Sequence, residues 1–70
     1  MYGYAAVLAA LRLHAQSLLA KARPAERDRL AKVHAEHILR NRAKLLVARL
    51  GQTDSETKRR EILRQALLGA

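Results

Sequence analysis

The sequence contains no Cys, Phe or Trp, and it has one Pro, three Gly and two Tyr among 70 residues. Without Cys, disulfide bonds, thiolate nucleophiles and cysteine-based zinc sites are excluded, and the redox compartment is left open. The scarcity of aromatic stacking side chains argues against binding of single-stranded nucleic acid. Half of the residues are hydrophobic, but they are chiefly Ala and Leu. We therefore expect a core of Leu side chains packed over Ala-lined helix backbones.

The length limits how much core the chain can build. A chain of this size forms at most one small domain, expected over residues 1–70, and buries only about 60% of its unfolded surface. A core made mainly of Leu and Ala in so short a chain is marginal by itself. The sequence therefore predicts that homodimerisation completes the fold.

Apolar spacing and helix-boundary residues predict an all-α fold of three helices. Apolar residues recur at three, four and seven positions across residues 4–22, the spacing of one helix face. A long central helix is expected over residues 24–50, because Pro24 suits a first helical turn and Gly51 suits a stop. A shorter third helix is expected over residues 54–68. These helices should pack as a hairpin or small bundle.

The first residues are apolar enough to raise the question of a signal peptide or a membrane span. They lack a basic amino-terminal region, and Arg12 interrupts the apolar run well short of the about 20 residues that cross a bilayer. We therefore expect a mature cytoplasmic protein without a membrane segment.

A polar stripe crosses the expected central helix. His34, His37 and Asn41 share a face with Leu30 and Leu45 at helical spacing, and polar groups buried there without partners cost free energy. A buried Asn in a helical seam commonly fixes register and oligomeric state. The predicted helix interface consists of Leu8, Leu11, Leu13, Leu30, His34, His37, Ile38, Asn41 and Leu45. The first helix either packs within its own chain or swaps onto a second copy.

The three histidines are candidate metal ligands. His34 and His37 are three residues apart, and His14 is a possible third ligand. The spacing is not that of the HExxH zinc motif, and no Cys or clustered carboxylate completes a set. We expect no metal and no cofactor. The favoured interpretation is that these side chains form hydrogen bonds at a helix interface and make assembly sensitive to pH.

The sequence gives no sign of catalysis. All six acidic residues have ordinary helical roles: four lie near expected helix starts (Glu26, Asp28, Asp54 and Glu56), and two are at helical spacing from an arginine (Glu36 from Arg40, Glu61 from Arg64). There is no glycine-rich phosphate loop, and three short helices enclose too little volume for a small-molecule pocket. We expect neither an enzyme nor a small-molecule substrate.

The strongest remaining feature is positive charge. Fourteen Lys and Arg against six Asp and Glu give a net charge of +8, which attracts polyanions. Two dense groups flank Gly51 and are the predicted phosphate contacts: Arg40, Arg42, Lys44 and Arg49 before it, and Lys58, Arg59, Arg60 and Arg64 after it. Their helical angles differ, so an ordinary solvated basic surface is an equal alternative.

Two functional hypotheses follow from this composition. The first is a regulatory homodimer that binds nucleic acid, DNA rather than RNA, through Lys and Arg contacts to phosphates. The second is an adaptor or inhibitor, of the kind that phages and mobile elements encode, which covers a site on a larger host protein. Salt separates them, because phosphate binding weakens steeply with salt and an apolar protein interface does not.

Overall fold

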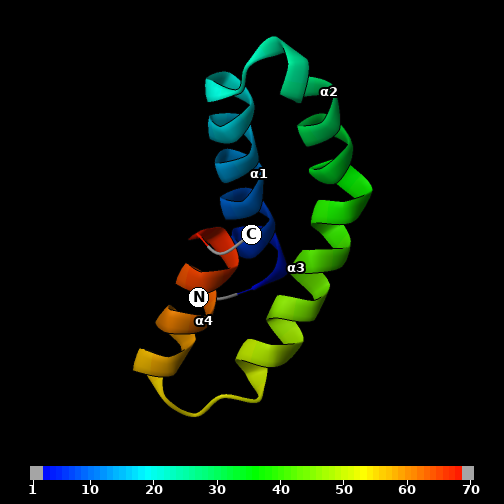
Figure 1. Cartoon of the computed structure of the whole chain (residues 1–70). Coiled ribbons are helices and arrows are strands. Elements are labelled where there is room, and N and C mark those ends of the chain that lie inside the picture. Colours follow the sequence, from blue (N-terminus) through cyan, green and yellow to red (C-terminus); the bar gives the residue numbers. More distant parts are fainter. Residues whose placement is uncertain (1–2, 69–70) are drawn as a thin grey trace.

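The computed structural model describes residues 3–68, and this part of the chain is all-helical (Figure 1). The elements are α1 (Tyr4–Lys21), α2 (Pro24–Val33), α3 (Glu36–Gly51) and α4 (Glu56–Leu68). Helix α1 runs in one direction, α2 and α3 return beside it, and α4 reverses again alongside the carboxyl-terminal half of α3. The predicted all-α class is confirmed, but the described residues form four helices instead of three.

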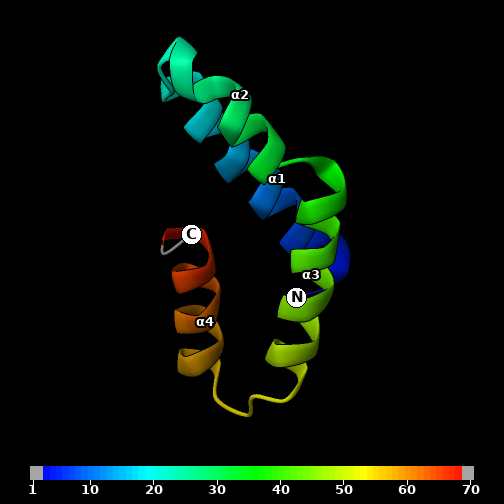
Figure 2. The same cartoon turned by 45° about the vertical axis from the view of Figure 1, so that its right-hand side comes forward.

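The prediction of one continuous helix over residues 24–50 is wrong. The chain leaves the helix at His34 (φ −108°, ψ 27°) and is extended at Ala35 (φ −61°, ψ 151°), so α2 and α3 have different axes (Figure 2). Leu30 and Leu39 explain the break. Nine residues at about 100° each would place them on opposite faces of one straight helix. In the fold Leu39 is buried in the core with residues of α1, and Leu30 lines a groove together with Leu18 of α1. The break turns both apolar faces toward α1.

The ends of the other helices follow local chemistry. Arg23 is extended (φ −70°, ψ 151°) and Pro24 occupies the first turn of α2, as the steric restriction before proline predicts. Gly51 is the last helical residue of α3, whereas the prediction ended the helix at residue 50 and placed Gly51 just after it. Helix α4 starts at Glu56, two residues later than expected, with the Ser55 hydroxyl accepting from the Lys58 amide at 3.5 Å.

The core lies between α1 and α3. Seven buried side chains compose it: Val7, Leu8, Leu11 and Ala15 from α1, and Leu39, Ala43 and Leu50 from α3. Two of the seven are alanines, which let the two helix backbones approach closely, as the composition predicts. Helix α4 has no fully buried residue and covers the core with partly buried apolar side chains. The folded chain therefore depends mainly on one helix pair.

The molecule is long and thin, with extents of 42 × 20 × 14 Å. Its radius of gyration of 12.8 Å exceeds the about 11 Å typical of a compact chain of this length. Its accessible surface of 5185 Å² exceeds the about 4400 Å² typical of a compact protein of this mass. Among the described residues, the exposed surface includes the large hydrophobic side chains Tyr4, Leu13, Val33, Leu45 and Leu68.

Candidate binding surfaces

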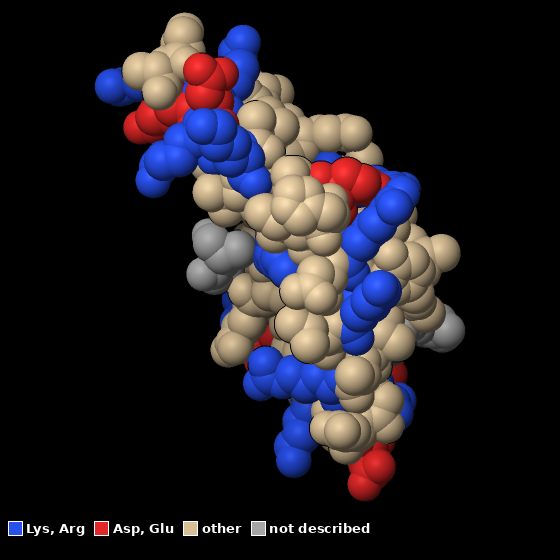
Figure 3. All heavy atoms as spheres, turned by 90° about the vertical axis from the view of Figure 1, so that its right-hand side faces the viewer, with Lys and Arg blue, Asp and Glu red and all other residues tan. Residues whose placement is uncertain are grey.

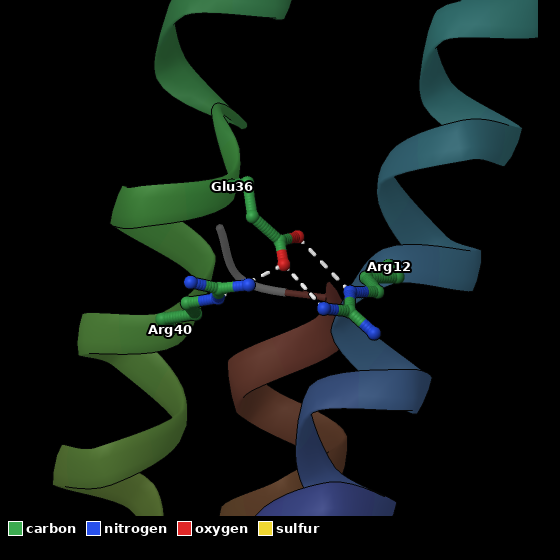
Figure 4. A network of polar contacts seen from close by, with 3 residues as sticks. All are labelled: Arg12, Glu36 and Arg40. Carbon is green, nitrogen blue, oxygen red and sulfur yellow. Dashed lines mark hydrogen bonds and ion pairs between the residues drawn. The ribbon is translucent and has the colours of Figure 1, made fainter.

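An ion-pair network joins α1 to α3 at Glu36 (Figure 4). Both carboxylate oxygens of Glu36 accept hydrogen bonds from Arg12 of α1, with the Arg12 Nε at 3.0 Å from Oε1. Arg40, one turn along α3, donates its Nε to Oε2 at 3.1 Å. The helical spacing predicts the bond to Arg40, but the bond to Arg12 depends on the tertiary fold. Arg40, a predicted phosphate contact, is therefore engaged within the chain.

These contacts set the protonation of Glu36. The hydrogen bond from Arg12, followed by the charges of Arg12 and Arg40, lowers the pKa of Glu36 below its ordinary value of 4.5 despite some desolvation. The same hydrogen bond raises the pKa of Arg12. Because the folded pKa of Glu36 is depressed, the network stabilises the fold above the unfolded pKa, and this contribution disappears as the pH falls through the folded pKa.

We expect Glu36→Gln to lower the melting temperature near neutral pH, because it removes the charged link between α1 and α3. The difference from the wild type should shrink as the pH falls below 4.5. Thermal melts followed by circular dichroism at several pH values measure it. Glu61→Gln is the control, because the Glu61–Arg64 pair lies within α4 and its removal should matter less. A difference that is unchanged from neutral to strongly acidic pH would contradict this role.

The predicted phosphate contacts of α3 fall into two groups. Arg42 is half-buried, and its Nη2 donates to the Ala66 carbonyl at 2.9 Å, which holds the end of α4 against α3. Lys44 and Arg49 are exposed and form no ion pair with any of residues 3–68. These two head groups are therefore available to an external anion.

The cations of α4 are mostly engaged. Arg59 is half-buried and donates its Nε to the Leu50 carbonyl at 3.2 Å, so it helps to close the α3–α4 turn. Arg60 lies 3.5 Å from a Glu56 carboxylate oxygen, and Arg64 lies 2.7 Å from one of Glu61. Lys58 is exposed without an ion pair in the described part of the chain. Of the eight predicted contacts, Lys44, Arg49 and Lys58 thus have no partner within residues 3–68.

Helices α3 and α4 fold back on each other around the turn after Gly51 (Figure 1), where Arg59 binds the Leu50 carbonyl. Arg40 and Arg42 lie farther along α3, where they bind Glu36 and the Ala66 carbonyl. The α1–α2 turn and helix α2 carry further exposed cations, with acidic residues interspersed among them: Lys21, Arg23, Arg27, Arg29 and Lys32. On the face formed by α2 and α3, uncharged side chains separate the Lys and Arg side chains (Figure 3). The positive charge is therefore distributed, with concentrations at the two ends.

The predicted interface residues also divide by location. Leu8 and Leu11 are buried in the chain's own core, so α1 packs within its own chain in this structure. Leu30, His34 and Ile38 are half-buried. The remaining four are exposed, with Leu13 at 67% and Leu45 at 65% exposure, together with His37 and Asn41. The polar stripe of α3 thus faces outward and is available to a second molecule.

His34 occupies the break between α2 and α3. Its Nδ1 is buried without a hydrogen-bond partner in the described structure. Burial, followed by the nearby charges of Arg42 and His14, lowers the pKa of His34, so the neutral imidazole is favoured. The described residues contain no group of three or more His, Asp or Glu side chains arranged to hold a metal ion.

Two open grooves flank His34. The first, about 420 Å³, is lined by Arg12, Ala15, Gln16, Leu19, His34, Glu36 and Leu39. The second, about 500 Å³, is lined by Leu18, Arg29, Leu30, Val33, His34, Ile38 and Arg42. The first contains the Arg12–Glu36 pair, whereas the second is largely apolar and has no acidic residue in its lining. Both depend on the break at His34 and Ala35, which the sequence did not reveal.

Within residues 3–68, no helix is both long and apolar enough to cross a membrane. Comparison of the chain with known protein families, with curated proteins and with solved structures finds no match. The candidate residues are therefore assigned from charge, exposure and contacts alone.

Proposed function

We propose that this chain is a basic, all-helical regulatory protein that binds nucleic acid as a homodimer, DNA in preference to RNA, and that it is not an enzyme. The observation that carries the proposal is unpaired positive charge. Of the fourteen Lys and Arg residues, five form ion pairs with acidic residues. The other nine have no acidic partner among residues 3–68. Such an excess on a small surface favours phosphate binding and release of condensed counterions.

The shape is compatible with contacts along a duplex. The cations at the α1–α2 turn and those around the α3–α4 turn lie at opposite ends of the long molecule (Figure 1). Its longest extent of 42 Å is comparable with one turn of B-form DNA, about 34 Å. We propose that Lys44, Arg49 and Lys58 contact phosphates at one end, while cations of the α1–α2 turn contact the backbone further along.

Exposed apolar surface supports the homodimer. Within residues 3–68 the core has seven buried side chains, and Leu45 is 65% exposed on the outer face of α3. Asn41 lies one turn away on the same face, where pairing across a two-fold axis would satisfy its amide. A second copy would cover Leu45 and add the burial that one chain lacks.

The test is binding to a fluorescent DNA duplex, followed by anisotropy, with the duplex RNA of the same sequence as the comparison. A chain that contacts about four phosphates should lose about 100-fold in affinity between about 50 and 200 mM salt. Sedimentation velocity of the free protein and of the complex measures the oligomeric state. An affinity that hardly changes with salt would exclude phosphate binding, and a compact monomer at micromolar concentration would exclude the dimer.

A second candidate function rests on a different observation. Exposed aliphatic side chains occur on all four helices, at Leu13, Val33, Leu45 and Leu68. Such residues favour an adaptor or inhibitor that covers a site on a larger protein, because apolar patches on small proteins mark interaction surfaces. Binding of this kind should be nearly independent of salt.

A further inference from the structure

The second groove beside His34 is lined by apolar side chains and by two arginines. Leu18 of α1, Leu30 and Val33 of α2 and Ile38 of α3 provide the apolar surface. Val33 is 51% exposed, so the groove is uncovered in the single chain. Arg29 and Arg42 line the same groove, and neither forms an ion pair with a described residue. The groove thus presents hydrophobic contact and positive charge together.

In the neighbouring groove the chain itself provides an acidic partner for the lining arginine. There Arg12 donates hydrogen bonds to the Glu36 carboxylate, so this lining arginine has an acidic partner within the chain. In the second groove no acidic side chain is present among the lining residues. Arg42 uses one of its N–H groups on the Ala66 carbonyl, a neutral acceptor that leaves the charge of Arg42 uncompensated. A ligand that complements the second groove therefore carries an anionic group for the arginines and an apolar group for the aliphatic side chains.

We propose that this groove binds an acidic amphipathic helix of a partner protein. Apolar side chains of that helix lie against Leu18, Val33 and Ile38, and its carboxylates bind Arg29 and Arg42. The apolar surface extends beyond the groove, because Leu45 is two helical turns from Ile38 on α3 and is 65% exposed. An amphipathic helix binds by laying its apolar face into such an exposed apolar groove. The proposal rests on the adaptor function and does not require nucleic-acid binding.

Charge selects this occupant over the alternatives. Each of the four helices carries more Lys and Arg than Asp and Glu, so a helix from a second copy would bring like charge to Arg29 and Arg42. A nucleic-acid backbone would satisfy the arginines but would leave the apolar side chains exposed to water. Only a helix with both carboxylates and aliphatic side chains complements both features.

The probes are three fluorescent peptides of about 18 residues, about 27 Å as a helix. The first has a Leu stripe with Glu on its other faces, the second has Lys in place of each Glu, and the third has Ser in place of each Leu. We expect the full chain to bind the first at least about tenfold more tightly than either of the others. Equal binding of all three, or preference for the Lys peptide, would overturn the proposal.

A pair of matched variants locates the binding site. Val33→Glu and Leu13→Glu both replace an exposed aliphatic residue and both lower the net charge by one. Of the two positions, only Val33 lines the groove. Val33→Glu should weaken binding of the acidic peptide by about tenfold or more, and Leu13→Glu should change it by less than about threefold. Equal weakening by both variants would show attraction by net charge alone and would overturn the groove assignment.

A second pair guards against effects on folding. Arg29→Ala removes a groove cation and Arg23→Ala removes an exposed cation at the α1–α2 turn. Only Arg29→Ala should weaken binding of the acidic peptide. Melting curves of all four variants accompany the titrations.

Val33→Glu and Leu13→Glu should weaken binding to duplex DNA equally. The two proposals can therefore fail separately: loss of peptide binding alone contradicts the groove assignment, and loss of DNA binding alone contradicts the nucleic-acid proposal.

Discussion

Leu11→Ala should lower the free energy of unfolding by about 2–5 kcal/mol, enough to leave much of the protein unfolded at room temperature. Leu11 is 1% exposed and is one of the two largest fully buried side chains of the described structure. It lies in the contact between α1 and α3, whose two helices supply all the buried residues of the described part of the chain. A core of this size supplies only about 3–5 kcal/mol of net stability, so one cavity removes most of it.

The measurement is urea unfolding followed by circular dichroism, with Leu13→Ala as the matched control. Leu13 is on the same helix but is 67% exposed, and its truncation should change the stability by less than about 0.5 kcal/mol. The experiment should be repeated at several protein concentrations, because a homodimer couples unfolding to dissociation. Similar losses for the two variants would show that Leu13 is buried in an assembly, and a small loss for Leu11 would contradict the α1–α3 core.

The helix faces could be predicted from the sequence because they depend on local spacing. The expected first helix, 4–22, nearly coincides with Tyr4–Lys21, and the reversal near Arg23 follows from Pro24 alone. The break at His34 and Ala35 could not be predicted in this way, because neither residue is Gly or Pro. It arises from a tertiary requirement, namely that apolar residues nine positions apart both face α1.

Which Lys and Arg side chains form contacts within the chain could also not be predicted fully from the sequence. Pairs at helical spacing, such as Arg64 with Glu61, could be recognised from position alone. Arg12 with Glu36 and Arg42 with the Ala66 carbonyl each join groups 24 residues apart, and only the fold brings them together. The sequence therefore indicated how much charge the chain carries, but the contacts decide which cations remain for a partner.

Replacement of Lys44, Arg49 and Lys58 together by Ala should weaken binding to duplex DNA by about 10²–10³-fold near 50 mM salt. These are the three predicted contacts that have no acidic or backbone partner within residues 3–68. Each lost phosphate contact should also reduce the slope of log K against log salt by about 1, so the triple variant should lose about three units of slope for each chain in the complex. Anisotropy titrations across a salt series measure both quantities. The fold should be retained, because all three side chains are exposed.

The control is a triple Ala variant of Arg40, Arg60 and Arg64, which removes the same number of charges. These arginines already pair with Glu36, Glu56 and Glu61, so their loss should lower the affinity less and leave the salt slope nearly unchanged. Arg59 is a poor choice for either set, because its bond to the Leu50 carbonyl makes any loss of binding ambiguous with loss of the α3–α4 turn. Equal salt slopes for the two triple variants would mean that DNA responds to the overall charge of the chain, and the α3–α4 end would then have no special part in binding.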